Sequence, residues 1–324
     1  MKAQAFAACA ALLIGNAAFA QFETTVQDGW VTWRVAAVDP APAWCCFSWN
    51  MGRVTESACD LDRNSSGFGN HDEQVNDTGE IQLYAKFRDG EPTRIRALSP
   101  MCPVRSPVIV TDLGLVDGDQ SIDWLGRYIG RSDKLSGNVL GAIAAHEGDR
   151  AIGVLVDTAE NARSYEIRED AIFWMGNLRA NETIAHLERY MFDDPSPDIR
   201  EKAAFAVSQS DAPNKVELLV RQGREDRDPD VRGEAWFWLA ETGAPEAEAA
   251  ILYAMREDRD EDVREEAVFA LSQLPGDRGV MALLGIVRDK GVERELREEA
   301  LFWLADSESD LALAEIEKLL FSSK

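Results

Sequence analysis

A hydrophobic pattern with helical spacing recurs through the second half of the chain. In the copy that begins at Val231, apolar residues follow at Ala235, Trp238 and Leu239, which lie four, seven and eight residues further along one helix face. Asp228 precedes the pattern as a capping residue, and the proline after it suits the first helical position. The pattern therefore predicts an amphipathic helix that begins near residue 229.

Five copies of this helix follow one another at a nearly constant spacing of 32 or 33 residues. Their central alanines are Ala171, Ala203, Ala235, Ala267 and Ala300. A second stretch with helical spacing follows each copy, at 183–192, 215–225, 247–257, 279–289 and 311–321. A fixed period of ~20–50 residues indicates stacked repeats. We therefore expect a mostly α-helical chain in which these pairs form an α-solenoid.

The start of the first helix carries a recognisable motif. Asp228–Ala235 (DPDVRGEA) and Asp260–Ala267 (DEDVREEA) resemble the first helix of HEAT repeats of the short bacterial type. The resemblance covers about Ser164–Phe321, with a degenerate pair before it at 137–160. It implies a right-handed α-solenoid of HEAT-like helix pairs, a fold that usually serves as a protein-binding scaffold.

The resemblance also implies two sets of polar residues with different roles. The first set forms a buried ladder between neighbouring repeats, in which Asp194, Asp226 and Asp258 meet arginines that follow the first apolar position. Those arginines are Arg168, Arg200, Arg232, Arg264 and Arg297. The second set recurs on the second helices and comprises Arg189, Arg221, Tyr253, Arg224, Arg256 and Arg288. Second helices usually line the concave surface of such solenoids, so this set is our candidate for partner binding; capping of helix C-termini is the alternative.

A row of phenylalanines lies beside the main apolar face of the repeated helix. Its members are Phe173, Phe205, Phe237, Phe269 and Phe302. A helix that is apolar on three sides needs neighbours on three sides, so we interpret the row as packing between repeats. An exposed aromatic stripe for binding is the alternative.

The periodicity changes to that of strands in the region before about residue 118. Apolar and polar residues alternate over 81–88 and 93–97, on either side of Asp89-Gly90, which predicts a β-hairpin. Further strands are expected at Trp30–Val38 and Ser106–Thr111, followed by a helix at Gln120–Ile129. We predict a small β-rich domain. The polar face of its hairpin carries Lys86, Arg88, Arg94 and Arg96, and solvation, docking onto the acidic repeats and ligand binding all remain open for them.

The cysteines of the mature chain are confined to this β-rich region. They are Cys45, Cys46, Cys59 and Cys102. An even number in an exported protein indicates two disulfides. Adjacent cysteines rarely bond to each other, so Cys45 and Cys46 should each pair with one of the other two, in either combination. A metal site of four thiolates lacks the usual spacing of zinc ligands, and a reactive Cys-Cys pair is a further alternative.

The first 20 residues have the pattern of a secretory signal peptide. Lys2 is followed by an apolar run, and Ala18-Phe19-Ala20 is a small-x-small cleavage site. The expected organisation is then a signal peptide at 1–20, a β-rich domain at 21–118, linking helices with a degenerate repeat at 119–160, and HEAT-like repeats at 161–324. We expect a monomeric protein that is periplasmic or secreted.

Composition restricts the partners of the protein. The formal net charge of −24 argues against binding to nucleic acid, because phosphate contacts require clusters of Lys and Arg. No mature stretch approaches the ~18 consecutive apolar residues that indicate a membrane span. A protein partner is therefore the expectation.

The sequence shows no motif for catalysis or for a cofactor. It has only three histidines and lacks the phosphate-binding, nucleophile-elbow and zinc-protease motifs. Asp60, Asp62 and Asn64 have the spacing of a calcium loop, but Ser65 and His71 replace the glycine and glutamate that such a loop requires. We predict a non-catalytic scaffold without cofactor or metal; the alternative is an enzyme or a metal- or ligand-binding protein with its site in the cysteine-containing domain.

Overall fold

The computed structural model describes residues 28–50, 53–56, 58–63, 67–69, 75–307 and 309–321. The chain forms two compact units, Met1–Trp174 (unit 1) and Met175–Lys324 (unit 2). The predicted signal peptide lies outside the described residues, as do His71, Asn64 and Ser65 of the calcium-like segment.

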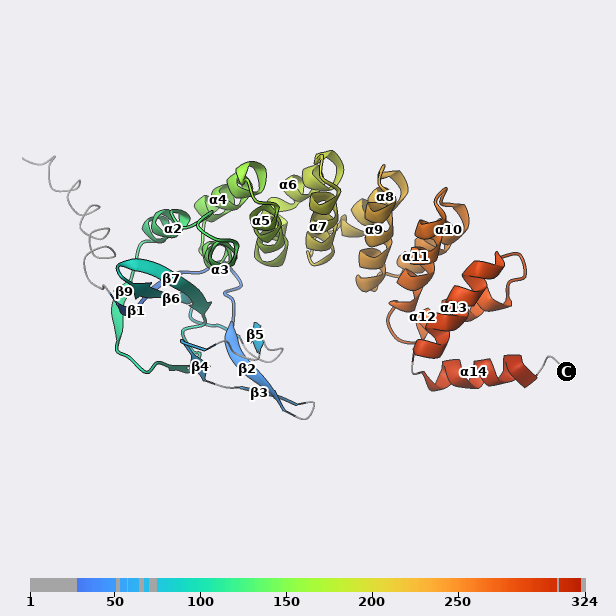
Figure 1. Ribbon diagram of the computed structural model, residues 1–324, viewed down its shortest axis with the longest axis horizontal. Coiled ribbons are helices and arrows are strands. Elements are labelled where there is room, and N and C mark those ends of the chain that lie inside the picture. Colours follow the sequence, from blue (N-terminus) through green and yellow to red (C-terminus); the bar gives the residue numbers. More distant parts are fainter. Residues whose placement is uncertain are drawn as a thin grey trace, which may run out of the picture. The chain divides into compact units, whose positions relative to one another are not determined.

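A four-stranded sheet forms the first part of unit 1 (Figure 1). It contains β1 (Gly29–Ala36), β6 (Glu80–Arg88), β7 (Glu91–Leu98) and β9 (Val110–Leu115), in the order β7-β6-β1-β9. Strands β6 and β7 form the predicted hairpin, and Asp89 and Gly90 at its turn have φ of 54° and 78°. Positive φ at both central residues is what a tight hairpin turn requires. Strand β9 begins at Val110, four residues after the start of the strand predicted at Ser106–Thr111.

Smaller β-elements carry the cysteines. They are β2 (Cys45–Asn50), β3 (Arg53–Glu56), β4 (Cys59–Asp60), β5 (Gly67–Gly69) and β8 (Val104–Arg105). Strand β2 pairs with β3 and β5, whereas β4 pairs in parallel with β8. A buried cluster of the four cysteines with Trp30, Leu61 and Leu98 holds these elements together.

Helix α2 (Gly118–Gly126) is fixed to the sheet by a chain of buried hydrogen bonds. The indole N–H of Trp33 on β1 donates to Ser121 Oγ at 2.8 Å, and Ser121 Oγ lies 2.9 Å from His146 Nε2. The other ring nitrogen of His146 is 2.8 Å from the carbonyl of Ala142. A carbonyl only accepts, so Nδ1 carries the proton and Nε2 accepts from the serine hydroxyl. This histidine therefore has a structural role.

Helix pairs make up the rest of the chain. Unit 1 contains α3 (Asp133–Ala144) and α4 (Asp149–Asn161), and α5 (Tyr165–Leu178) crosses the boundary between the units. Unit 2 contains α6 (Ala180–Asp193), α7 (Pro197–Ser208), α8 (Lys215–Glu225), α9 (Pro229–Glu241), α10 (Ala247–Glu257), α11 (Glu261–Ser272), α12 (Asp277–Arg288), α13 (Arg294–Asp306) and α14 (Asp310–Phe321). None of the helices in the described part of the chain is long and apolar enough to cross a membrane.

The caps and cores of these helices follow the repeat pattern. Asp228 and Asp260 cap α9 and α11 by accepting a backbone N–H two residues ahead, and Pro229 occupies the first turn of α9. Ser196 lies at the corresponding position of α7, but its side chain makes no capping bond. Most of the main apolar face is buried; in α9, for example, Val231, Ala235 and Leu239 are fully buried and Trp238 is half-buried.

The two rows of helices in unit 2 are packed differently. The helices of the repeated pattern, α7, α9, α11 and α13, pack extensively on one another and on the helices that precede them, whereas α6, α8 and α10 touch along their row over fewer residues. A curved stack has its closer packing on the inner side. Figure 1 accordingly shows α7, α9 and α11 on the inner side of the curve within unit 2, and α8 and α10 on the outer side.

Candidate protein-binding surfaces

The predicted Asp–Arg ladder is present in unit 2 and is buried. Arg200 donates from Nε and Nη2 to both carboxylate oxygens of Asp226 at 2.8 Å, and Arg232 binds Asp258 in the same way at 3.0 and 2.9 Å. Both guanidinium groups are 2% exposed. Each also donates to the carbonyl of the aspartate six residues before it. A buried bidentate ion pair of this kind has a structural role, because all of its hydrogen bonds are needed to offset the desolvation of the two charged groups.

The Arg–Asp ladder becomes longer in its contacts and more exposed toward the C-terminal end of unit 2. Arg264 donates to the carbonyl of Asp258 at 3.0 Å, but its carboxylate partner is the exposed Glu293 at 3.6 Å. At this end Gly291 stands where the earlier repeats have aspartate.

The arginines proposed for partner binding lie on the outer row, where three of them form ion pairs with neighbouring helices. Arg221 on α8 lies 3.3 Å from Glu188 on α6, and Arg256 on α10 lies 3.3 Å from Asp289, next to α12. Arg288 binds Glu315 on α14. These pairs tie one repeat to the next at the exposed surface.

The helix packing corrects the pairing from which those arginines were chosen, because each repeated helix of unit 2 packs more extensively on the helix before it than on the helix after it. We predict α8, α10 and α12 as second helices that line the concave surface, but in unit 2 the closely packed row consists of α7, α9, α11 and α13. Figure 1 shows α7, α9 and α11 of this row on the inner side. Helices α6, α8, α10 and α12, which carry Arg189, Arg221, Arg224, Tyr253, Arg256 and Arg288, form the other row. A binding role for these residues remains a prediction, now for the outer surface.

Two members of that set meet in a small hollow. The Arg224 guanidinium lies 5.2 Å from the ring centroid of Tyr253, which is 54% exposed. A cavity of about 270 Å³ adjoins them, lined also by Trp236 and by Glu257 at the end of α10. Arg189 instead lies over its neighbour Tyr190, at 5.2 Å. The sequence analysis thus grouped residues that the structure places in separate local contacts.

The inner row carries a continuous series of aromatic rings, which we call the aromatic ladder. In unit 2 it consists of Phe205, Phe237, Trp238, Phe269, Phe302 and Trp303. Rings of successive repeats touch: the centroids are 4.7 Å apart for Phe205–Trp238, 5.7 Å for Phe237–Phe269 and 4.6 Å for Phe269–Trp303. These contacts confirm that the phenylalanine row packs between repeats.

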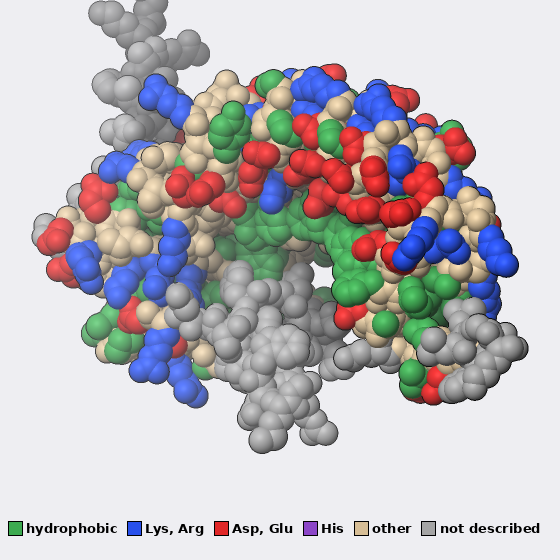
Figure 2. Space-filling view, turned by 45° about the vertical axis from the view of Figure 1, so that its right-hand side comes forward, with side chains coloured by type: hydrophobic (Ala, Val, Ile, Leu, Met, Phe, Trp, Pro, Cys, Tyr) green, Lys and Arg blue, Asp and Glu red, His purple; other side chains and the backbone are tan. Residues whose placement is uncertain are grey.

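The aromatic ladder is also open to solvent. Phe205, Phe237, Trp238 and Phe269 are only half-buried, and Phe302 is 58% exposed. In the space-filling view, hydrophobic side chains gather on the hollowed side of the repeats, and Asp and Glu side chains form a band beside them (Figure 2). Packing and exposure, which the sequence analysis treated as alternatives, therefore occur together.

A row of glutamates accompanies the aromatic ladder, and we call it the carboxylate row. Glu201 on α7, Glu234 on α9 and Glu266 on α11 form it. Partial burial raises the pKa of Glu201 to about 7, assisted by the charges of Glu234 and of Asp198. The pKa of Glu266 is likewise raised to about 7, by burial and then by Asp230 and Glu234. The row thus gathers acidic side chains whose charged form is disfavoured by partial burial and by the neighbouring acids.

A glycine on the neighbouring helix leaves space for the carboxylate of Glu266. A side chain at Gly233 on α9 would overlap the carboxylate of Glu266, because a Cβ there would lie 1.3 Å from Glu266 Oε2. Glu266 therefore rests directly against the backbone of the preceding repeat. The sequence analysis missed this row; the signal was a glutamate three or four residues before an aromatic residue in consecutive repeats.

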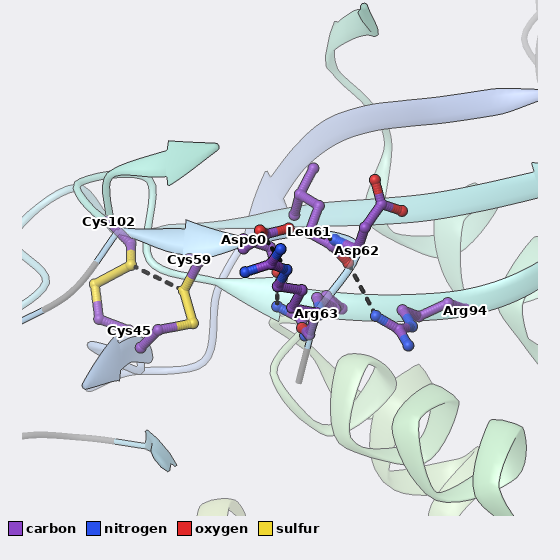
Figure 3. Close-up of a disulfide and its surroundings, with 10 residues drawn as sticks. Cys45, Cys59, Asp60, Leu61, Asp62, Arg63, Arg94 and Cys102 are labelled. Carbon is purple, nitrogen blue, oxygen red and sulfur yellow. Dashed lines mark hydrogen bonds and ion pairs between the residues drawn. A yellow bond between two sulfur atoms is a disulfide. The ribbon is translucent and has the colours of Figure 1, made fainter. Parts of the chain in front are cut away.

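The cysteines of unit 1 pair in one of the two predicted combinations. Cys45 bonds to Cys102 and Cys46 to Cys59, with Cα–Cα distances of 5.4 and 5.1 Å (Figure 3). Successive side chains of a strand point to opposite faces, so adjacent cysteines on β2 are able to bond to two different segments. Among the described residues no group of three His, Cys, Asp or Glu side chains is arranged to hold a metal ion.

The basic face of the hairpin is covered by the segment that follows Cys59. Arg94 donates to the carbonyl of Leu61 at 3.0 Å (Figure 3), and Arg96 donates to the carbonyl of Asp60 at 3.2 Å. Lys86 binds the carboxylate of Asp62, and this contact lowers the pKa of Asp62. Lys86, Arg94 and Arg96 therefore hold a neighbouring part of unit 1, which is a fourth interpretation beside the three that the sequence left open, whereas Arg88 is exposed.

A cavity of about 430 Å³ lies beside β7 in unit 1. Its walls include Trp44, Trp174 and Lys134, with Arg94 and Arg96 along the strand. The ring centroids of Trp44 and Trp174 are 5.3 Å apart. Burial lowers the pKa of Arg96, and the charge of Arg94 acts in the same direction. The cavity thus combines aromatic surface with positive charge in an acidic chain.

Comparison with known proteins places the repeats in a family. Residues 152–235 and 216–305 match the family model described as HEAT repeats. No curated protein matches the sequence. The solved structures to which the chain is similar include the following three.

Human deoxyhypusine hydroxylase is 20% identical over 63% of this chain and 80% of that one, with a TM-score of 0.28. YibA of Escherichia coli is 18% identical over 62% and 75%, with a TM-score of 0.38. The CpcE–CpcF complex of phycocyanin lyase from Nostoc sp. PCC7120 is 16% identical over 56% and 97%, with a TM-score of 0.28.

Proposed function

We propose that this chain, a HEAT-repeat protein, is an exported, non-catalytic scaffold that binds another protein. Its main binding surface would be the inner row of unit 2, formed by the aromatic ladder and the carboxylate row. The N-terminal β-rich part would add a second contact surface. Stacked repeats provide an extended surface of this kind, because equivalent side chains recur at each step of the stack.

The observation that carries this proposal is the exposure of the aromatic ladder. Soluble monomers rarely expose large contiguous apolar surface, and such a patch with a polar border is typical of a protein interface. Aromatic residues are also enriched among the residues that dominate binding energy. The ladder extends over α7, α9, α11 and α13 and has a border of carboxylates, so it meets both descriptions.

Export is supported by the cysteines. Both disulfides lie in unit 1 within a buried cluster, and such bonds persist in oxidising compartments such as the periplasm or the extracellular space. The leader-like residues 1–20 point the same way.

The scaffold function is tested by affinity capture with the full mature chain from the envelope fraction of the native organism. The test variant is Phe302→Ser, at an exposed ladder position, and the control is Met281→Ser on α12, which is similarly exposed at 56%. We expect one stoichiometric partner that is retained by the control and lost by the test variant. Equal recovery with both variants would show that the aromatic ladder is not the binding surface.

The cavity of unit 1 supports a second candidate function, the binding of a small anionic aromatic ligand. Paired indole rings favour a planar apolar group, and Arg94, Arg96 and Lys134 favour a carboxylate or phosphate. The matched test is native mass spectrometry of the full chain with a panel of aromatic carboxylates, compared with Lys134→Gln. Binding that Lys134→Gln does not weaken would place the ligand elsewhere.

A further inference from the structure

Each repeat of the inner row presents a ring and a carboxylate side by side. Glu234 precedes Phe237 by three residues and Trp238 by four, and Glu266 precedes Phe269 by three. Positions three or four apart are neighbours on the surface of a helix. The carboxylate row and the aromatic ladder therefore run in parallel across α7, α9 and α11.

The carboxylate row has no cationic partner of its own. Among the ion pairs between described residues, none includes Glu201, Glu234 or Glu266. The outer row differs, since Arg221 and Arg256 there pair with carboxylates of neighbouring repeats. The face that exposes the aromatic rings therefore also carries three acidic side chains that no ion pair of the described residues neutralises.

The inner row already contains one contact of the kind that a cationic ligand would make. The ammonium of Lys202 on α7 lies 6.0 Å from the ring centroid of Phe205. A cation over an aromatic face is attracted by the negative charge density of the ring, by roughly 0.5–2 kcal/mol depending on solvation. The rings of the following repeats carry carboxylates beside them in place of the lysine, because Glu234 and Glu266 occupy the position of Lys202.

We propose that this face binds a basic segment of another protein, with Lys or Arg over the carboxylate row and apolar side chains against the aromatic ladder. This inference rests on the proposed function, because it names the partner class for the surface assigned there. A bound cation would relieve the repulsion among Glu201, Glu234 and Asp230. Burial is the main cause of the raised pKa values of Glu201 and Glu266, and the neighbouring acids raise them further, in the direction that such repulsion requires.

The spacing of the repeats sets the spacing of the basic residues. Packed helices lie ~8–10 Å apart, and a chain in the extended polyproline II conformation advances about 3.1 Å per residue with about three residues per turn, so that every third side chain faces the same side. One repeat is therefore spanned by about three residues of an extended segment. A segment with a basic residue at every third position, and an apolar residue beside it, would match the carboxylate row and the aromatic ladder together.

Fluorescence anisotropy with labelled fifteen-residue peptides tests this directly on the full mature chain. The probe is (Lys-Leu-Ser)5. One control, (Glu-Leu-Ser)5, has the opposite charge, and a second, (Lys-Ser-Ser)5, lacks the apolar residues. We expect saturable binding of the probe at about 0.15 M salt, at least a tenfold weaker affinity for (Lys-Ser-Ser)5, and none for (Glu-Leu-Ser)5. Equal affinity for both lysine peptides would overturn the combined apolar and basic recognition.

Charge-matched variants locate the binding site. Glu234→Lys reverses an exposed member of the carboxylate row, and Glu217→Lys makes the same change at an exposed position of α8 on the outer row. We expect Glu234→Lys to weaken binding of the probe at least tenfold and Glu217→Lys to change it less than twofold. Equal losses would mean that the peptide responds only to the overall negative charge.

The outcome separates this inference from the proposed function. If affinity capture yields a partner that depends on Phe302 but the probe peptide does not bind, the surface is an interface and the basic partner class is wrong. If the probe binds and Phe302→Ser leaves both captured partner and peptide affinity unchanged, the aromatic ladder has no part in either. Circular dichroism and thermal unfolding of each variant show whether the fold is intact.

Discussion

The disulfide-linked part of unit 1 and the helix pairs of unit 2 are both held by bonds between segments distant in sequence. In unit 1, two covalent links join positions 13 and 57 residues apart, around one small buried cluster. In unit 2, each buried Arg–Asp pair joins positions 26 residues apart, and the same contact returns one repeat later. A covalent link restricts the unfolded chain, whereas a buried ion pair depends on complete pairing in the folded state, so the two regions should respond to different changes.

The largest effect is expected from breaking one step of the Arg–Asp ladder. Asp258→Ala leaves the guanidinium of Arg232, which is 2% exposed, without its carboxylate. A buried charge that loses its partner typically costs about 3–5 kcal/mol of the free energy of unfolding. Urea unfolding followed by far-UV circular dichroism measures the loss.

The matched control is the exposed pair between Arg256 and Asp289. Arg256→Ala removes a cation that is 55% exposed in its pair, and such surface pairs contribute about 0–1 kcal/mol. Similar small losses for Asp258→Ala and Arg256→Ala would contradict a structural role for burial in the ladder.

A second effect, somewhat smaller, concerns the covalent links of unit 1. Removing one disulfide with the double change Cys46→Ala and Cys59→Ala should destabilise unit 1 by about 3 kcal/mol, the value for a loop of about 15 residues. Hydrogen exchange read by mass spectrometry should rise in peptides of β2 and β4 and stay constant in α9 and α11. A rise of the same size in unit 2 would show that the two regions do not respond separately.

The helix pairs could be predicted from sequence because each repeat packs against copies of itself. The period that places Ala235 and Ala267 on equivalent helices also places Asp226 and Asp258 near the arginines they bind, so a local pattern fixes a tertiary contact. The sequence also limits the cysteine pairing to two combinations, because adjacent residues such as Cys45 and Cys46 rarely bond to each other. The choice between the two pairings depends on the path of the chain between β2 and β4. The pattern of apolar and polar residues does not reveal that path.

The surfaces could not be predicted in the same way. Which row of helices is inner depends on the difference in packing distance between the rows, and both rows have the same period. Phe237 is only half-buried, and a hydrophobic pattern does not indicate how much of an apolar side chain stays exposed. The cover over Arg94 comes from Leu61, 33 residues away in a segment without repeats.

The third prediction compares two glycines of unit 2 with opposite surroundings. A Cβ at Gly223 on α8 would lie 2.5 Å from the ring of Trp236, a buried and rigid side chain. Gly223→Ala should therefore destabilise by about 1–3 kcal/mol, despite the better helix propensity of alanine. A Cβ at Gly233 would overlap the flexible end of Glu266, which is able to move, and would lie 3.3 Å from the Cβ of Glu266, so Gly233→Ala should be neutral or stabilise by up to about 1 kcal/mol. Urea unfolding of the two variants checks the sign of each change, and a reversed order would show that the ring moves more easily than the carboxylate.

The smallest effect concerns the pH dependence of the carboxylate row. The folded-state pKa of Glu266, about 7, lies above its ordinary value of 4.5, because of burial and the charges of Asp230, Glu234, Asp262 and Asp260. The folded protein then binds more protons than the unfolded chain between these values, so this contribution is fully present below about pH 4.5 and is lost as the pH rises through 7.

Replacement of this glutamate by an amide isolates that contribution. Glu266→Gln should unfold at higher urea than the unmodified protein at about pH 8, by roughly 1 kcal/mol once solvent screening of a partly exposed group is included, and should match it near pH 4. About 1 M salt should shrink the difference at high pH, since the effect arises partly from like charges near the surface. A variant that is less stable than the unmodified protein at pH 8 would mean that the carboxylate of Glu266 has a favourable partner, which would also remove the basis for a cationic ligand at the carboxylate row.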